Sequence, residues 1–175
     1  MRHEATIACQ PNVLPLPDVE EVASLRKEIM RLRRENRALS IALSEMERVA
    51  QRDMLTPLFN RRYFLSALHQ RIARVDRYGD RIALIYVDVD GLKAINDEHG
   101  HAAGDFALIE IAARVSSMMR GCDILARIGG DEFGILLDHV SQSEARGKMA
   151  RLLSAIEDDP CHYAGQDIPL SAAFG

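Results

Sequence analysis

Apolar residues recur at alternating intervals of three and four between residues 19 and 50, which is the heptad pattern of a coiled coil. A single asparagine at an a position, Asn36, favours a two-stranded and in-register pairing. Glu21 and Glu28 lie at g positions, where a parallel partner presents Arg26 and Arg33. The pattern predicts a parallel dimeric coiled coil, and a single amphipathic helix packed on its own domain is the alternative. The a and d positions of the seam are Val22, Leu25, Ile29, Leu32, Asn36, Leu39, Leu43, Met46 and Ala50.

After residue 50 the pattern changes to that of an α+β domain. Thr56 and Pro57 predict a helix cap and a first helical position, with the helix running to about Asp76. The order of the elements that follow is strand, helix, hairpin, helix, strand. This is the split βαβ, ferredoxin-like arrangement, a palm-type antiparallel sheet with flanking helices. We expect strands over 81–90, 124–128 and 133–138, helices over 103–119 and 142–157, a turn over 129–132, and a last strand within 168–175.

Composition excludes several classes of protein. The 175 residues carry a formal net charge of -4, so the chain lacks the basic surface of a nucleic-acid-binding protein. No apolar run reaches the length of about 20 residues that a membrane span needs. The three cysteines, Cys9, Cys122 and Cys161, form neither a metal motif nor a disulfide framework. These features predict a protein of the reducing cytoplasm.

Carboxylates gather at two places in the predicted sheet. Asp88 and Asp90 end a strand and share a face, and Asp131 and Glu132 follow two glycines in the hairpin turn. The split βαβ order places that strand beside the hairpin, so the four side chains can converge. Carboxylates without histidines suit Mg²⁺ or Mn²⁺, which commonly bind substrate phosphates as well. The alternative is a set of solvated acids at strand ends, beside a glycine turn.

Three segments resemble the bacterial diguanylate cyclases with a GGDEF domain: DMLTPLFNRRYF (53–64), DVDGLKAINDEHGHAAGD (88–105) and RIGGDEFGILL (127–137). The resemblance implies a GGDEF domain over 53–175, a stalk over 18–52 and a flexible tail over 1–17. Domains of this family continue into a final helix whose Lys and Arg residues hold GTP phosphates. The sequence ends at Gly175, so either it is a piece of a longer chain or these cations are absent, and we expect the domain over 53–175 to lack this C-terminal helix.

The resemblance also implies roles for individual residues. Asp88 and Asp131 would bind metal through their carboxylates and Val89 through its carbonyl, with two Mg²⁺ or Mn²⁺ ions in each active site. The expected catalytic residues are Asp131, Glu132 and Lys93. Substrate would be bound by Leu92, Lys93, Asn96, Asp105, Gly129 and Gly130, of which Asn96 and Asp105 would read guanine. An inhibitory product site is expected at the RxxD residues Arg120 and Asp123, with Arg151 as a further arm.

The function implied is the condensation of two GTP molecules into cyclic di-GMP and two pyrophosphates. Each domain of a homodimer would supply half of the active site, and cyclic di-GMP would inhibit through the RxxD site. A catalytically inactive module that binds GTP or cyclic di-GMP is the main alternative. A coiled-coil adaptor is a third, although it leaves the motif acids unexplained. Any sensing at a membrane would come through an upstream partner protein.

Overall fold

The computed structural model describes residues 18–175, apart from the side chain of Arg48. The tail predicted over residues 1–17 lies outside the described residues. The chain divides into two compact units between Met46 and Glu47, and each unit is described by itself. Within residues 18–175, none of the helices combines the length and hydropathy that crossing a bilayer requires.

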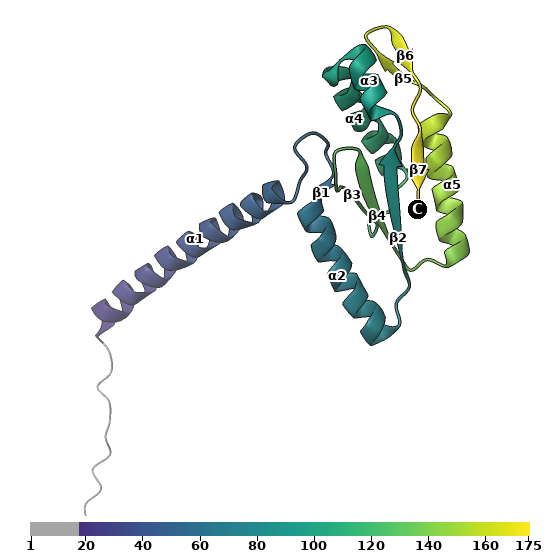
Figure 1. Cartoon of the computed structure of the whole chain (residues 1–175). Helices are drawn as coiled ribbons and strands as arrows, with labels where there is room; N and C mark the ends of the chain where they lie inside the picture. Colours follow the sequence, from purple (N-terminus) through teal and green to yellow (C-terminus); the bar gives the residue numbers. More distant parts are fainter. Residues whose placement is uncertain (1–17) are drawn as a thin grey trace, which may run out of the picture. The chain divides into compact units, whose positions relative to one another are not determined.

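The described part of the first unit is most of α1, one uninterrupted helix over Val19–Ala50 whose last four residues belong to the second unit (Figure 1). Its bounds agree with the heptad pattern. Leu32 and Leu39 of the seam are 50% and 70% exposed, so a row of apolar side chains faces solvent in the single chain. Glu28 is paired here with Arg31 on its own helix, at 2.7 Å, rather than with a second chain. An exposed apolar seam of this length is typical of a helix that pairs with another helix; the parallel dimer stays a prediction.

The second unit contains the remaining elements, and most of the predicted strands and helices are confirmed. A helix over 92–99 and a separate hairpin over 161–168 were not predicted. The elements are β1 (Phe59–Asn60), α2 (Arg61–Tyr78), β2 (Ile82–Val89), α3 (Leu92–His99), α4 (His101–Ser117), β3 (Ile124–Arg127), β4 (Glu132–Asp138), α5 (Gln142–Glu157), β5 (Cys161–Tyr163), β6 (Gln166–Ile168) and β7 (Ala172–Phe174).

The main sheet has the strand order β1-β3-β4-β2-β7. The four strands β3, β4, β2 and β7 are antiparallel throughout, which confirms the ferredoxin-like arrangement. The short β1 adds a parallel pair at the edge, because Phe59 and Asn60 lie beside Ala126 and Arg127 of β3. The sheet is therefore mixed rather than purely antiparallel. Strands β5 and β6 form a two-stranded sheet of their own.

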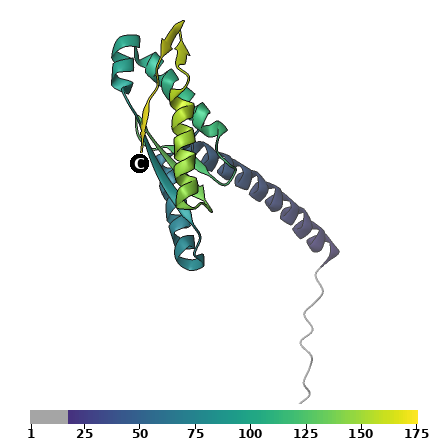
Figure 2. The same ribbon diagram turned by 90° about the vertical axis from the view of Figure 1, so that its right-hand side faces the viewer.

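Helices cover both faces of the sheet (Figure 2). On one face, Ile111 of α4 and Leu152 of α5 pack in one core with Val87 of β2, and all three are nearly inaccessible to solvent. On the other face, α2 packs Phe64 over Ala126 and Leu136 of the β3–β4 hairpin. Strand β2 buries every second side chain and exposes Leu84, Tyr86 and Asp88 between them. This alternation places one exposed row of β2 beside the hairpin turn.

The start of α2 differs from the prediction. Asn60, not Thr56, caps the helix, and its side chain accepts a hydrogen bond from the backbone N–H of Tyr63 at 3.0 Å. Thr56 is buried and donates through both its N–H and its hydroxyl to Asp53 Oδ1, each at 2.8 Å. Asp53 therefore closes its own turn ahead of Pro57. Thr56 and Pro57 therefore mark this turn and not the start of a helix.

Candidate active site

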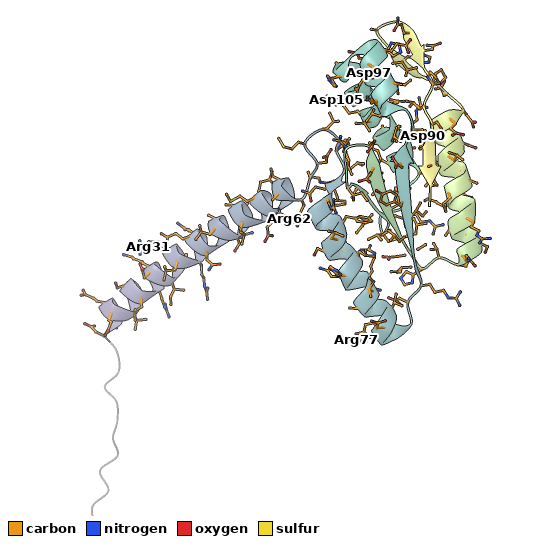
Figure 3. All side chains as sticks on the ribbon, viewed as in Figure 1. Arg31, Arg62, Arg77, Asp90, Asp97 and Asp105 are labelled. Atoms are coloured by element: carbon orange, nitrogen blue, oxygen red, sulfur yellow. The ribbon has the colours of Figure 1, made fainter. Side chains whose placement is uncertain are left out.

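The carboxylates of the two motifs meet at the end of the β2–β4 pair. Asp88 of β2 lies directly opposite Glu132 of β4 in the register. The N–H of Val89 donates to the carbonyl of Asp131 at 3.0 Å, which ties the hairpin turn to the end of β2. The structure thus brings Asp88, Val89, Asp131 and Glu132 together from segments about 40 residues apart. Asp90, labelled in Figure 3, is the first residue after β2, and its carboxylate accepts a hydrogen bond from Ser171 Oγ at 3.0 Å.

Negative charge is concentrated at this place. The pKa of the exposed Asp88 carboxyl is raised above its ordinary value by partial desolvation, and then by the charges of Asp131, Glu132 and Asp90. Repulsion among carboxylates raises a pKa in this way when no cation separates them. The arrangement therefore favours a bound cation, or a ligand that carries one.

The donors present fit a divalent metal of the Mg²⁺ type. Among residues 18–175, no three Asp, Glu, His or Cys side chains form a complete cage for a metal ion. Two carboxylates, Asp88 and Asp131, with the carbonyl of Val89 nearby, offer hard oxygen ligands and leave other positions open. Mg²⁺ is commonly held by one or two carboxylates plus substrate phosphates and water, so the residues fit a metal that arrives with a nucleotide.

Tyr86 is a member of this cluster that the sequence analysis missed. Its hydroxyl donates to Glu132 Oε1, and this bond, with the neighbouring charges of Glu132, Asp88 and Asp131, raises the pKa of Tyr86 to about 12. On the other side of the same carboxylate, Gly129 is so close that a Cβ there would lie 2.0 Å from Glu132 Oε2. The signal available in the sequence was the strand period of two, which puts residue 86 on the face of Asp88.

The residues expected to read guanine lie on α3 and α4. The Asn96 side chain packs against Gly104, where a Cβ would lie only 2.0 Å from Asn96 Oδ1. Asp105 follows Gly104 and is exposed on α4 (Figure 3). Asn96 therefore lies beside the residue that precedes Asp105, and the reading of guanine by this pair stays a prediction. Lys93 is exposed and Leu92 half-buried in the first turn of α3, directly after Gly91, whose φ of 68° is left-handed.

A second support of the hairpin turn comes from the segment that precedes β1. Arg127 donates to the carbonyl of Gly130 at 2.7 and 3.2 Å and also contacts Asp53 Oδ1 at 3.4 Å. Partial burial alone would raise the pKa of Asp53, but hydrogen bonds from Thr56 and the Arg127 guanidinium outweigh it and hold the pKa below its ordinary value. The sequence analysis did not assign Arg127 or Asp53, because nothing in their local pattern links them.

The residues of the predicted inhibitory site line a cavity of about 400 Å³ on another part of the domain. Arg120, Asp123 and Arg151 all contribute to its wall, together with Lys148 and Glu144. The side chain of Asp123 is only 2% exposed; it accepts from the N–H of Arg120 at 2.9 Å and from Lys148 Nζ at 3.4 Å. Lys148 is a third cation of this cavity that sequence reasoning missed.

Comparison with known proteins defines the class. The family model described as "Diguanylate cyclase, GGDEF domain" matches residues 50–175. The chain belongs to this family, which confirms the resemblance read from its three motifs.

Individual relatives give the same result. The probable diguanylate cyclase DgcE of Escherichia coli (strain K12) is 43% identical over 133 residues, which cover 76% of this chain and 12% of DgcE. The crystal structure of diguanylate cyclase SiaD with its activator SiaC from Pseudomonas aeruginosa has a TM-score of 0.71 at 30% identity, covering 90% of this chain and 59% of that chain.

The coiled coil and GGDEF domain of DgcB from Caulobacter crescentus, in complex with c-di-GMP, is similar in fold. Its TM-score is 0.77 at 23% identity, with 87% of this chain and 81% of that chain covered. This chain spans between 12% and 38% of the length of the curated relatives it matches.

Proposed function

We propose that this chain condenses two GTP molecules into cyclic di-GMP and two pyrophosphates. The observation that carries the proposal is the pairing of Asp88 with Glu132, with Asp131 in the adjoining turn. A cluster of hard oxygen donors suits nucleotidyl transfer from a metal-bound nucleotide, and the candidate guanine pair lies on α3 and α4, the helices that follow β2.

Two Mg²⁺ or Mn²⁺ ions in each site would neutralise phosphate charge and lower the pKa of the attacking hydroxyl. Asp88, Asp131 and the carbonyl of Val89 would hold them. In each of two steps, the 3′-oxygen of one GTP bonds to the α-phosphorus of the other, and the bond to pyrophosphate breaks. Asp131 and Glu132 would accept the proton of the hydroxyl, while Lys93 and the backbone around Leu92, Gly129 and Gly130 would hold the phosphates.

Base selection would come from Asn96 and Asp105. A carboxylate can accept from both the N1–H and the exocyclic amine of guanine, whereas adenine has an acceptor at N1 and no amine at position 2. An Asn beside it supplies a donor and an acceptor. This pair would admit GTP and reject ATP, because a mismatched base leaves polar groups unpaired.

The dimer would be part of the active site. Each GGDEF domain, over 53–175, would bind one GTP and supply half of the reacting groups. A parallel coiled coil of the stalk, over 18–52, would raise the effective concentration of the second half-site. An upstream sensor or activator protein acting on the stalk would control this encounter.

Cyclic di-GMP would inhibit by binding the cavity of Arg120, Asp123 and Arg151. A guanidinium can form a bidentate contact with a phosphate or with the edge of guanine. A catalytically inactive module that binds cyclic di-GMP is the second candidate function. It is favoured by the separation of this cation-lined cavity from the acidic cluster, because the cavity needs no metal to receive an anion.

Turnover separates the two candidates. The purified chain with GTP and Mg²⁺ should release cyclic di-GMP and pyrophosphate in a ratio of one to two, as measured by chromatography and a coupled phosphate assay. ATP in place of GTP should give no cyclic product. Binding of cyclic di-GMP without any turnover would instead support the inactive module.

A further inference from the structure

The Glu132 carboxylate has a hydrogen-bond donor on one side and the open space of a glycine on the other. Tyr86 donates to one carboxylate oxygen, and the other oxygen occupies the space that a side chain at residue 129 would fill. A free glutamate at the start of a strand has several rotamers open to it. Here the Tyr86 hydroxyl selects one of them, and the missing side chain at Gly129 leaves room for it.

The sheet register explains why Tyr86 can reach this acid. Tyr86 lies opposite Gly134, and Asp88 lies opposite Glu132, so Tyr86 and Glu132 are diagonal neighbours on one face of the antiparallel pair. Diagonal neighbours lie about 7–8 Å apart, within reach of an aromatic side chain. The ring of Phe64 occupies the space above Gly134, the residue directly opposite Tyr86.

The kind of donor matters for chemistry at this place. Glu132 lies directly opposite Asp88 and next to Asp131 in the chain, and carboxylates so placed repel one another. An arginine or lysine would restrain Glu132 but would also neutralise part of the charge that attracts a metal-bound nucleotide. A phenol hydroxyl restrains the carboxylate through a hydrogen bond and adds no positive charge.

We propose that Tyr86 is a positioning residue for the cyclase reaction, which holds the Glu132 carboxylate in the orientation that faces the reacting 3′-hydroxyl. The inference rests on the proposed function. Tyr86 does not contact the reacting atoms itself, and it acts through Glu132. Its contribution therefore belongs to the chemical step rather than to the binding of GTP.

The test uses the full chain with Tyr86→Phe, which removes the hydroxyl and keeps the ring. We expect kcat to fall about tenfold while the KM for GTP stays unchanged, because a misoriented catalytic group slows the chemical step. Leu84→Ala is the matched control, since Leu84 is exposed on the same face of β2 and is 52% accessible. This control should keep the wild-type kcat.

A double-mutant cycle identifies the route of the effect. Glu132→Asp shortens the carboxylate beyond the reach of Tyr86, so adding Tyr86→Phe to it should cause no further loss of kcat. A full additional loss in the double variant would overturn the inference, because Tyr86 would then act by another route. An unchanged kcat in Tyr86→Phe alone would overturn it as well.

Crystal structures of wild type and Tyr86→Phe give a result that does not depend on turnover. Glu132 should occupy one conformer in the wild type and several in the variant. If the wild type makes no cyclic di-GMP, the proposed function fails, while the conformers still test the positioning by Tyr86. A Glu132 side chain that keeps its conformer without the hydroxyl would overturn it.

Discussion

The acidic cluster at the end of β2 and the cavity around Arg120 use opposite charge. Asp88, Asp131 and Glu132 lie close enough for the charges of the other two to raise the pKa of Asp88, so this cluster favours a cation. In the cavity, by contrast, the carboxylate of Asp123 is already paired with Lys148, and Arg120 and Arg151 line the remaining space. The first region suits a metal-bound substrate and the second an anion alone. Charge arrangement therefore distinguishes the proposed reacting site from the proposed binding site within one small domain.

The largest expected effect comes from Asp131→Asn. Removal of this carboxylate takes away a proposed metal ligand, and the rate of cyclic di-GMP formation should fall by about a thousandfold or more. Binding of cyclic di-GMP to the cavity, measured by calorimetry, should be unchanged. Retained turnover in this variant would disprove the role of the acidic cluster.

Removal of residues 1–46 should also affect the two regions differently, because it should lower turnover and leave the binding of cyclic di-GMP intact. The cut leaves the carbonyl of Ala50 in place, which accepts from Asn60 at 2.8 Å and from Arg62 at 2.6 Å. Without the coiled coil, light scattering should find a monomer, and turnover at micromolar protein should fall about a hundredfold or more. Each monomer should still bind cyclic di-GMP, because the cavity is already formed within a single chain. A truncated chain that stays dimeric at low concentration would contradict the role of the stalk.

Arg120→Ala should impair the cavity and spare the acidic cluster, which is the reverse of the effect of Asp131→Asn. Loss of a charged hydrogen-bond donor should weaken cyclic di-GMP binding about 10- to 100-fold and relieve product inhibition. Initial turnover, before product accumulates, should match the wild type. Arg146→Ala is the control, because Arg146 is exposed on α5 and is not part of the cavity wall. Equal affinity of Arg120→Ala and wild type for cyclic di-GMP would remove the inhibitory site from the proposal.

Asp53→Asn should have the smallest effect, and it tests the support of the acidic turn. It weakens the bonds from Thr56 and Arg127 and should lower the free energy of unfolding at neutral pH by about 1–3 kcal/mol. Because the folded pKa of Asp53 is depressed, this stabilisation is fully present above the ordinary value of 3.8 and is lost as the pH falls through the lower folded value. Urea denaturation at several pH values should show the two proteins converging in acid.

A matched control for this variant is Asp76→Asn, an exposed carboxylate on α2. It should change the free energy of unfolding at neutral pH much less than Asp53→Asn does. A difference between Asp53→Asn and wild type that persists at low pH would mean that the carboxylate charge is not the stabilising feature.

The sequence by itself determined the elements whose signals are local. The heptads predicted a helix that runs over Val19–Ala50, and the apolar spacing predicted α5 at its observed bounds, Gln142–Glu157. The split βαβ order also predicted that Asp88 lies beside the hairpin acids, and Asp88 does lie opposite Glu132. Side-chain periodicity is a property of neighbouring residues, so it can be read along the chain.

Only the tertiary structure decided the contacts that hold the two regions in place. Tyr86 meets Glu132 across 46 residues and Arg127 meets Asp53 across 74. The strand period puts Tyr86 on the face of Asp88 but does not identify Glu132 as its partner, and Arg127 and Asp53 share no period at all. The capping residue of α2 also depended on the tertiary structure. Thr56 and Asn60 are both residue types that cap helices, but Thr56 is hydrogen-bonded to Asp53 and Asn60 caps α2. Such pairings depend on strand register and on packing between distant segments, which become defined only when the sheet has assembled.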